Sequence, residues 1–209
     1  STQGVSSAAS DVYKRQPKET ALFPLSINVL PGAYLPLQIF EPRYIDMVKD
    51  CLGKEKGFCI VLMKEEKEIP ALKAQHSATG TYVEVVDFNQ LENGLLGITV
   101  QGKYRAQILD RREQEDGLLL GNIVQSKEAE DICREEDYEN IWRVLREISE
   151  HPEIKKLELE IDFSSSSSVA YNLASLLPIS PLDKQLILES SSNKTRLESL
   201  QEILKKLGG

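Results

Sequence analysis

The sequence contains few of the residues that usually build catalytic or metal centres. Its 209 residues include only two histidines, and neither lies in an HExxH motif. The three cysteines are scattered and form no CxxC pair, so a zinc site would have to use mostly distant carboxylates. We therefore expect no metal site and no cofactor. An odd number of isolated cysteines is typical of reduced, buried thiols and indicates a cytoplasmic protein.

Long apolar segments and nucleotide-binding motifs are also missing. The longest apolar runs, at 58–63 and 95–100, are far shorter than the roughly 18–20 residues that a membrane helix needs. No secretory leader opens the sequence, so we expect no association with membranes. There is no G-x-x-x-x-G-K-S/T loop for ATP and no G-x-S-x-G nucleophile motif. The sequence therefore predicts a protein that is not an enzyme.

The charge of the chain is acidic, with 33 acidic and 25 basic residues. The field of such a protein repels nucleic-acid phosphates and anionic lipids. One basic cluster surrounds a predicted hairpin, although acidic residues interrupt it: Lys103, Arg105, Arg111 and Arg112. A nucleic-acid partner is therefore disfavoured, and nucleic-acid binding stays as the alternative function.

Two alternating segments and a helix are predicted at the start of the folded part. The segments 25–29 and 35–39 alternate apolar and polar residues, which is typical of half-buried strands. Pro42 stands where a helix takes its first turn, a position that proline favours. Apolar residues at helical spacing follow, up to Gly53, which we expect to act as the C-cap.

Five further segments have the length and apolar pattern of strands. Gly102 lies between two of them, and Asn93-Gly94 is a strong hairpin signal. The five segments are 58–63, 80–88, 95–100, 104–109 and 118–124. About six or seven short strands with one helix predict a compact, mostly antiparallel barrel or sandwich.

The chain changes character after residue 126 and becomes helical. A charged stretch leads into a helix over 141–148, which Pro152 should end, and His151 should lie favourably at the end of that helix. The run Ser164–Ser168 is predicted to be a flexible link that ends in an N-cap serine.

Two more helical patterns complete the chain. They cover 169–177 and 181–207, with a break predicted at 190–193. We therefore assign residues 1–19 to a disordered or non-native tail, 20–126 to a β-rich lobe and 127–209 to a helical lobe. The fold class is α+β.

Several blocks of this sequence resemble the N-terminal substrate-binding domain family of Lon proteases. The matching blocks are Leu22-Phe23-Pro24-Leu25, Val29-Leu30-Pro31-Gly32, Leu35 to Tyr44, Gly80-Thr81, Ile98 to Ile108, Leu173 to Pro178, Lys184 to Glu189 and Arg196 to Leu200. The resemblance extends over nearly all of 21–207. It implies a PUA-like pseudo-barrel followed by a helical bundle, in agreement with the two lobes predicted from periodicity.

The resemblance also implies a function and a partner class. It indicates a stand-alone, non-catalytic module that binds unfolded or misfolded polypeptides in protein quality control or degradation. A protease or another quality-control protein would then be a further partner. Most of the signature has a structural explanation: Pro42 begins the helix, and Arg43 should bind Glu41 or a carbonyl at a strand end.

The most specific prediction concerns where a polypeptide would bind. Along the strand 80–88, strict alternation separates Val83 and Val85 from Val86 and Phe88, so both faces carry large apolar groups. One face must serve the core, and the other is either covered by the helical lobe or exposed. The family resemblance suggests that two residues of the opening block lie near such a surface. The predicted binding residues are Leu25, Pro36, Val86 and Phe88.

Overall fold

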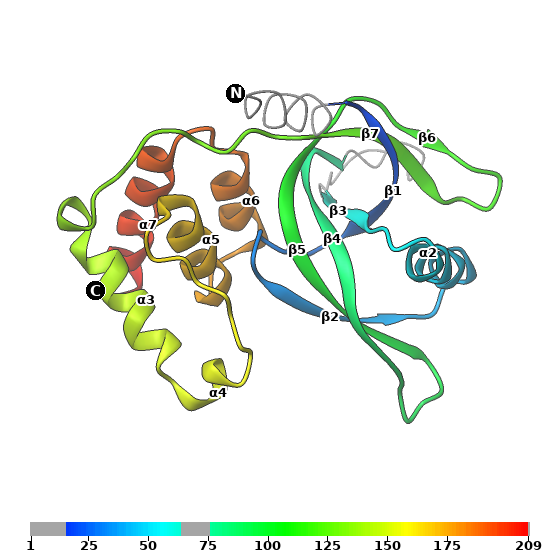
Figure 1. Ribbon diagram of the computed structural model, residues 1–209, viewed down its shortest axis with the longest axis horizontal. Coiled ribbons are helices and arrows are strands. Elements are labelled where there is room, and N and C mark those ends of the chain that lie inside the picture. The colour runs from blue at the N-terminus through cyan, green and yellow to red at the C-terminus, as the bar shows by residue number, and fades with distance from the viewer. Residues whose placement is uncertain (1–15, 64–75, 209) are drawn as a thin grey trace, which may run out of the picture.

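The computed structural model describes residues 16–63 and 76–208, which form a curved sheet with one helix beside a group of helices (Figure 1). This is the predicted α+β class, with the sheet in the N-terminal half and the helices after it. The strands are β1 (Lys18–Leu25), β2 (Tyr34–Ile39), β3 (Phe58–Met63), β4 (His76–Gln90), β5 (Leu96–Ile108), β6 (Arg112–Glu113) and β7 (Leu119–Gln125). Lys18 and Glu19 thus belong to the sheet, although the sequence placed them in the tail.

The sheet closes on itself. Its strand order is β2-β5-β4-β3-β1-β7-β6, and the end of β5 also pairs with β7. Five strands therefore form a ring, while β2 extends from the first half of β5 and β6 extends from β7. Only the β1–β3 pairing is parallel among the described strands. Seven strands with one helix, α2 (Pro42–Gly53), match the sequence prediction.

Neighbouring residues of the strands point into two different apolar clusters. Phe23 and Ile60 pack with the buried face of α2, whereas Leu22 and Cys59 pack on the opposite face of the sheet. Burial on both faces explains why β3 is an unbroken apolar run rather than an alternating one. Cys59 is a free, buried thiol, as expected from the scattered cysteines.

The helices build a second core. They are a 3-10 turn η2 (Glu135–Asp137), α3 (Glu139–Ser149), α4 (Pro152–Lys155), α5 (Ser166–Leu176), α6 (Pro181–Glu189) and α7 (Asn193–Gly208). Trp142, Leu145, Leu173 and Leu197 meet at its centre. The gap between α6 and α7 confirms the break that the sequence predicted at 190–193.

Buried contacts join the two lobes. The segment between β1 and β2 reaches the helices in Figure 1, and its Leu30 is buried in the helical core. Arg105 of β5 is also buried and donates to the carbonyls of Ser190 at 2.6 Å and Lys127 at 2.7 Å. Gln185 of α6 donates to the carbonyl of Thr79 at 3.0 Å. The lobes therefore share polar and apolar contacts rather than a flexible connection.

The strand predictions need two corrections. The first strand ends at Leu25 instead of covering 25–29, because the chain then leaves the sheet towards the helices. The strands predicted at 95–100 and 104–109 are one strand, β5, with Gly102 inside it. A Cβ at Gly102 would lie 2.3 Å from the carbonyl oxygen of Leu30, so glycine is needed for close backbone approach and not for a turn.

The helix that begins at Pro42 ends at Gly53, as predicted, but its C-cap is Lys54 and not Gly53. The predicted role of Pro152 is wrong. Pro152 begins α4 instead of closing α3, which already ends at Ser149. His151 is the N-cap of α4, where its Nδ1 accepts from the Glu153 amide at 3.3 Å. Its observed role is therefore to accept a hydrogen bond at the N-terminus of α4.

The serine run is ordered and is not a flexible link. A serine of the run does cap α5, but it is Ser165, which accepts from the Ser168 amide, and not the last serine as predicted; the helix already begins at Ser166. Ser166 Oγ donates to the carbonyl of Cys133 at 3.1 Å, and Ser167 Oγ donates to Asn193 Oδ1 at 2.7 Å. The serine hydroxyls thus make hydrogen bonds at the start of α5. The flexible link predicted from the serine-rich composition is therefore wrong.

Candidate functional site

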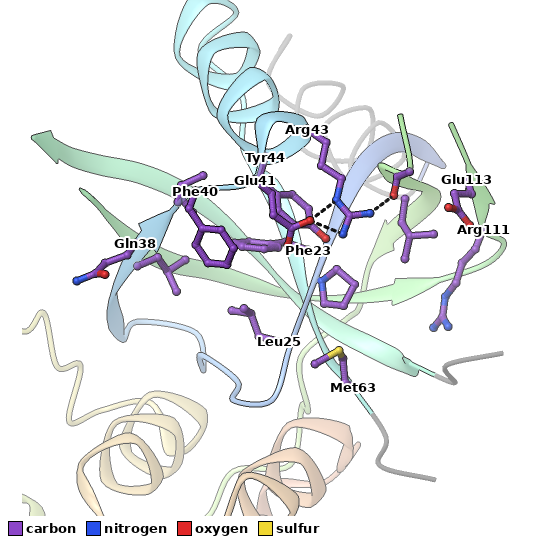
Figure 2. Close-up of a pocket in the computed structure, with 15 residues that line it drawn as sticks. Phe23, Leu25, Gln38, Phe40, Glu41, Arg43, Tyr44, Met63, Arg111 and Glu113 are labelled. Carbon is purple, nitrogen blue, oxygen red and sulfur yellow. Dashed lines mark hydrogen bonds and ion pairs between the residues drawn. The ribbon is translucent and has the colours of Figure 1, made fainter. Parts of the chain in front are cut away.

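A hollow lies between the ends of β1 and β2, the start of α2 and the β6–β7 connection. Its volume is about 580 Å³. Figure 2 shows Phe23, Leu25 and Phe40 grouped on one side of it, with Met63 nearby. Phe40 is largely exposed although its neighbour Ile39 is buried. We call this space the β1–β2 hollow; it offers apolar groups to solvent within a cavity of the size used by ligands.

A charged pair closes one side of the β1–β2 hollow. Arg43 Nε donates to Glu41 Oε2 at 2.9 Å, and Arg43 Nη1 donates to the carbonyl of Gly117 at 2.6 Å (Figure 2). The guanidinium also lies 4.7 Å from the ring centroid of Tyr44, whose pKa is raised chiefly by burial. Arg43 therefore binds both kinds of partner predicted for it, and its donors serve the fold.

A smaller hollow lies between the lobes, on the other side of β2. Its volume is about 310 Å³. Tyr34 and Pro36 line it from β2, and Leu157, Leu159 and Leu176 line it from the helical lobe. We call it the interlobe hollow. It is lined largely by apolar side chains.

Strand β2 separates the two hollows. Leu37 and Ile39 line the β1–β2 hollow, while Tyr34 and Pro36 line the interlobe hollow. This division follows from the strand period of two, which directs successive side chains to opposite faces. Gln38 lines the β1–β2 hollow as well, at its rim, and its side chain is exposed.

The four predicted binding residues do not form one surface. Leu25 lines the β1–β2 hollow and Pro36 lines the interlobe hollow. Val86 and Phe88 are exposed on the β4–β5 hairpin. The structure thus brings Leu25 and Pro36 to opposite sides of β2 and leaves the other two on a separate arm.

An irregularity in β4 changes the predicted faces of that hairpin. The register shifts between Val85, which pairs with Val100, and Asp87, which pairs with Thr99. Phe88 therefore lies opposite Ile98, and both Val100 and Ile98 belong to the core that contacts α2. Since directly paired side chains share a face, Val85 and Phe88 lie on the same face, not on opposite ones.

The basic residues do not form a patch. Arg105 is buried between the lobes, and Arg112 donates to Glu19 Oε1 at 2.7 Å. Lys103 pairs with Glu84 at 3.4 Å. Arg111 donates to the carbonyl of Ser77. Their hydrogen bonds stabilise the fold, which weakens the nucleic-acid alternative.

Phe40 and Met63 line the β1–β2 hollow, although the sequence pattern did not identify either residue as part of a site. Phe40 directly follows a buried position of β2, so a period-two pattern assigns it to the polar side. The one hint in the sequence is that Phe40, a large apolar residue, breaks the alternation of the strand two residues before Pro42. Met63 ends an apolar strand and gives no signal in sequence that separates it from the core.

Among the described residues, no group of three or more His, Cys, Asp or Glu side chains could hold a metal ion. Burial raises the pKa of Cys59 to about 12, so its thiol stays protonated and unreactive at neutral pH. No helix in 16–63 or 76–208 is long and apolar enough to cross a membrane. The chain is thus an α+β domain with an open hollow on each side of β2.

The chain belongs to the family of the ATP-dependent protease La (LON) substrate-binding domain, whose family model matches residues 19–206. A LON peptidase N-terminal domain and RING finger protein of Schizosaccharomyces pombe is 27% identical over 88% of this chain and 45% of its own length. A Lon protease of Bacillus thuringiensis is 26% identical over 88% of this chain and 24% of its own length. The chain thus spans less than half the length of these curated relatives.

A solved structure agrees with this assignment. The crystal structure of a Lon N-terminal domain protein from Xanthomonas campestris superposes with a TM-score of 0.70 at 27% identity. The match covers 88% of this chain and 98% of that one. The predicted family and fold are both confirmed. The Lon substrate-binding domain is itself a non-catalytic domain.

Proposed function

We propose that this chain binds unfolded or misfolded polypeptide segments, in protein quality control or degradation, without catalysing a reaction. The carrying observation is the pair of open hollows on opposite faces of β2, of which the interlobe hollow is largely apolar and the β1–β2 hollow combines apolar with charged side chains. Exposed apolar groups that gather in one region of a protein usually mark an interaction site. The family description, a substrate-binding domain, supports the same role.

The four residues predicted from sequence fit this proposal as separate contributors. Leu25 and Pro36 would contact a client inside the two hollows, and Val86 and Phe88 would add contacts on the hairpin. A protease or another quality-control protein would act on the bound client. The name of the yeast relative includes a RING finger, and those of the bacterial relatives a protease. Each supports a partner of this kind.

Binding to a permanently unfolded protein tests the proposal. The full chain should bind fluorescently labelled, reduced and carboxymethylated α-lactalbumin, and it should not bind the native, disulfide-intact protein. Because apolar burial drives the contact, affinity should change little between about 50 and 200 mM salt, a range in which phosphate contacts weaken binding by orders of magnitude. Equal affinity for the native protein would contradict the proposal.

A mixed-sequence RNA is the matched control for the alternative. The dispersed basic residues predict no RNA binding under the same conditions. RNA binding that falls steeply with salt, together with no binding of unfolded protein, would establish the nucleic-acid function instead.

A further inference from the structure

The outer edge of β2 carries main-chain groups that face away from the sheet. Gly102 N donates to the carbonyl of Ala33 at 2.9 Å, so position 33 faces β5. In an antiparallel ladder, every second residue faces the partner. Leu35 and Leu37 therefore bond to β5, while Tyr34, Pro36 and Gln38 present their main chain to the outside. Pro36 fits this phase, since proline in a sheet occupies an edge position without a required donor.

This edge has no partner strand within the described part of the chain. β2 is the first strand of the sheet order and pairs there with β5 alone. It offers two amide donors, at Tyr34 and Gln38, and three carbonyl acceptors. Unpaired edge groups of this kind are a template for another extended chain.

The two hollows offer space for the side chains on both faces of such an added strand. A strand beside β2 sends successive side chains alternately to each face of the sheet. One set would enter the β1–β2 hollow of about 580 Å³, and the other would enter the interlobe hollow of about 310 Å³. Larger apolar side chains fit the first set and smaller ones fit the second.

We propose that an extended apolar segment of a client polypeptide adds as a strand to the open edge of β2, with alternate side chains in the β1–β2 hollow and the interlobe hollow. This inference rests on the proposed polypeptide-binding function and specifies its mode. Main-chain hydrogen bonds supply affinity that does not depend on sequence, and the hollows supply a preference for apolar residues. That combination suits a domain that binds many unfolded chains.

A second copy of this chain is a poorer occupant of the edge than an unfolded segment. Leu35, Leu37 and Ile39 of β2 already pack against the β-sheet core. Paired with another β2, these side chains would stay in their own protein and leave both hollows unfilled. An unfolded segment has free side chains on both of its faces.

Gln38 provides a test on the protein side. Its exposed side chain makes no hydrogen bond that the fold requires, and its amide faces outward. Gln38→Pro removes that one donor without removing a hydrogen bond to β5. Leu37, the preceding residue, is in the extended conformation that a following proline requires. Gln38→Thr is the matched control, because it changes the same side chain and keeps the amide. Circular dichroism and thermal melting check that both variants fold.

The probe is a labelled ten-residue peptide in which leucine alternates with threonine, with two lysines at each end. We expect Gln38→Pro to weaken its binding about fivefold or more, because a carbonyl of the peptide loses its donor. Gln38→Thr alters the same hollow-lining side chain but keeps the amide, so it should weaken binding clearly less than Gln38→Pro. Equal affinity of the two variants would overturn strand addition.

Amide exchange in the unmodified chain gives a second measurement, which does not depend on the proline variant folding. Binding of the peptide should slow exchange at Tyr34 and Gln38, whereas the amides of Leu35 and Leu37 are already protected by β5. Binding with unchanged exchange at Tyr34 and Gln38 would overturn the proposed mode and leave polypeptide binding intact. Failure to bind either the peptide or unfolded α-lactalbumin would overturn the proposed function itself.

Sedimentation without peptide tests the second-copy alternative. We expect a species whose mass does not depend on whether Gln38 is replaced by proline. A dimer that dissociates only in the Gln38→Pro variant would assign the edge to self-association and overturn the proposal.

Discussion

Phe88 lies directly opposite Ile98 in the β4–β5 ladder, yet 60% of Phe88 is exposed and only 3% of Ile98. Both side chains share the face of the sheet that α2 covers further along. The β4–β5 ladder continues beyond the core as a hairpin arm. The side chain of Phe88 therefore points to the same face as the core residues, but most of it is left uncovered there. That mismatch makes it a candidate for contacts with another molecule.

Replacing Phe88 by serine should therefore separate binding from stability. We expect the free energy of unfolding in urea to stay within about 0.5 kcal/mol, as for most exposed positions. Binding of unfolded α-lactalbumin should weaken several-fold. Ile98→Ser should instead cost about 3 kcal/mol or more, because it empties a packed site.

Gln90→Ser, on the same hairpin, is the control for the loss of an exposed but polar side chain. It should change neither quantity. A large loss of stability in Phe88→Ser would assign Phe88 to the core, and unchanged binding would place the client contacts elsewhere.

The positions of most strands followed from apolar periodicity, but their faces did not. Alternation in 80–88 assumed a regular strand, and the shift at Val86 reversed the face of everything after it. A bulge is set by the register of the partner strand, which is a long-range property. Sequence therefore identified Phe88 as exposed apolar surface without showing which residues share its face.

Contacts between the lobes were equally hidden from local patterns. Leu30 directly precedes Pro31-Gly32, a pair that is typical of turns, yet its side chain is part of the helical core. The serine run had the composition of a linker, and its hydroxyls are used in hydrogen bonds to Cys133 and Asn193. In both cases the decisive partner lies more than twenty residues away, beyond any sequence window.

Arg196 should be among the most sensitive positions for stability. Its side chain is fully buried, donates to Glu128 at 2.9 Å and to the carbonyl of Ser190 at 2.7 Å, and lies 4.6 Å from the ring centroid of Tyr171. Arg196→Met leaves these acceptors without their donor, which should cost about 3 kcal/mol in urea unfolding.

Arg143→Met is the matched control for that change. Arg143 pairs with Glu147 on the surface of α3, with both side chains more than half exposed. Its loss should change stability by about 0.5 kcal/mol or less. Similar values for the two variants would mean that the buried guanidinium does not organise the helical lobe.

Two glycines should respond in opposite directions to alanine. At Gly102 the new Cβ would lie 2.3 Å from the Leu30 carbonyl oxygen, so Gly102→Ala must displace backbone between the lobes. At Gly53 no atom lies within 4 Å of the new Cβ, and the residue is helical. Gly53→Ala should raise the free energy of unfolding by about 0.5–1 kcal/mol, and Gly102→Ala should lower it by more than that. Stabilisation by Gly102→Ala would contradict the close approach of Leu30 to β5.

Asp131 should link the stability of the helical lobe to pH. Desolvation by the neighbouring chain raises the pKa of its carboxyl, but hydrogen bonds from the amides of Asn193 and Lys194 and from Ser192 outweigh this, and the net shift is downward. A carboxyl whose folded pKa is depressed stabilises the fold above its unfolded pKa of about 3.9 and loses that contribution as the pH falls through the folded value. The carboxylate also lies at the start of α7, where negative charge is favourable.

Asp131→Asn keeps the shape and an acceptor oxygen while removing the charge. The urea midpoint of this variant should lie below that of the unmodified chain at pH 7, and the difference should shrink between about pH 5 and pH 3 as the carboxyl protonates. Asp46→Asn, which alters an exposed pair with Lys49, is the control and should show a much smaller difference at pH 7. A difference for Asp131→Asn that stays constant down to pH 3 would mean that hydrogen-bond geometry, and not charge, is what Asp131 contributes to the start of α7.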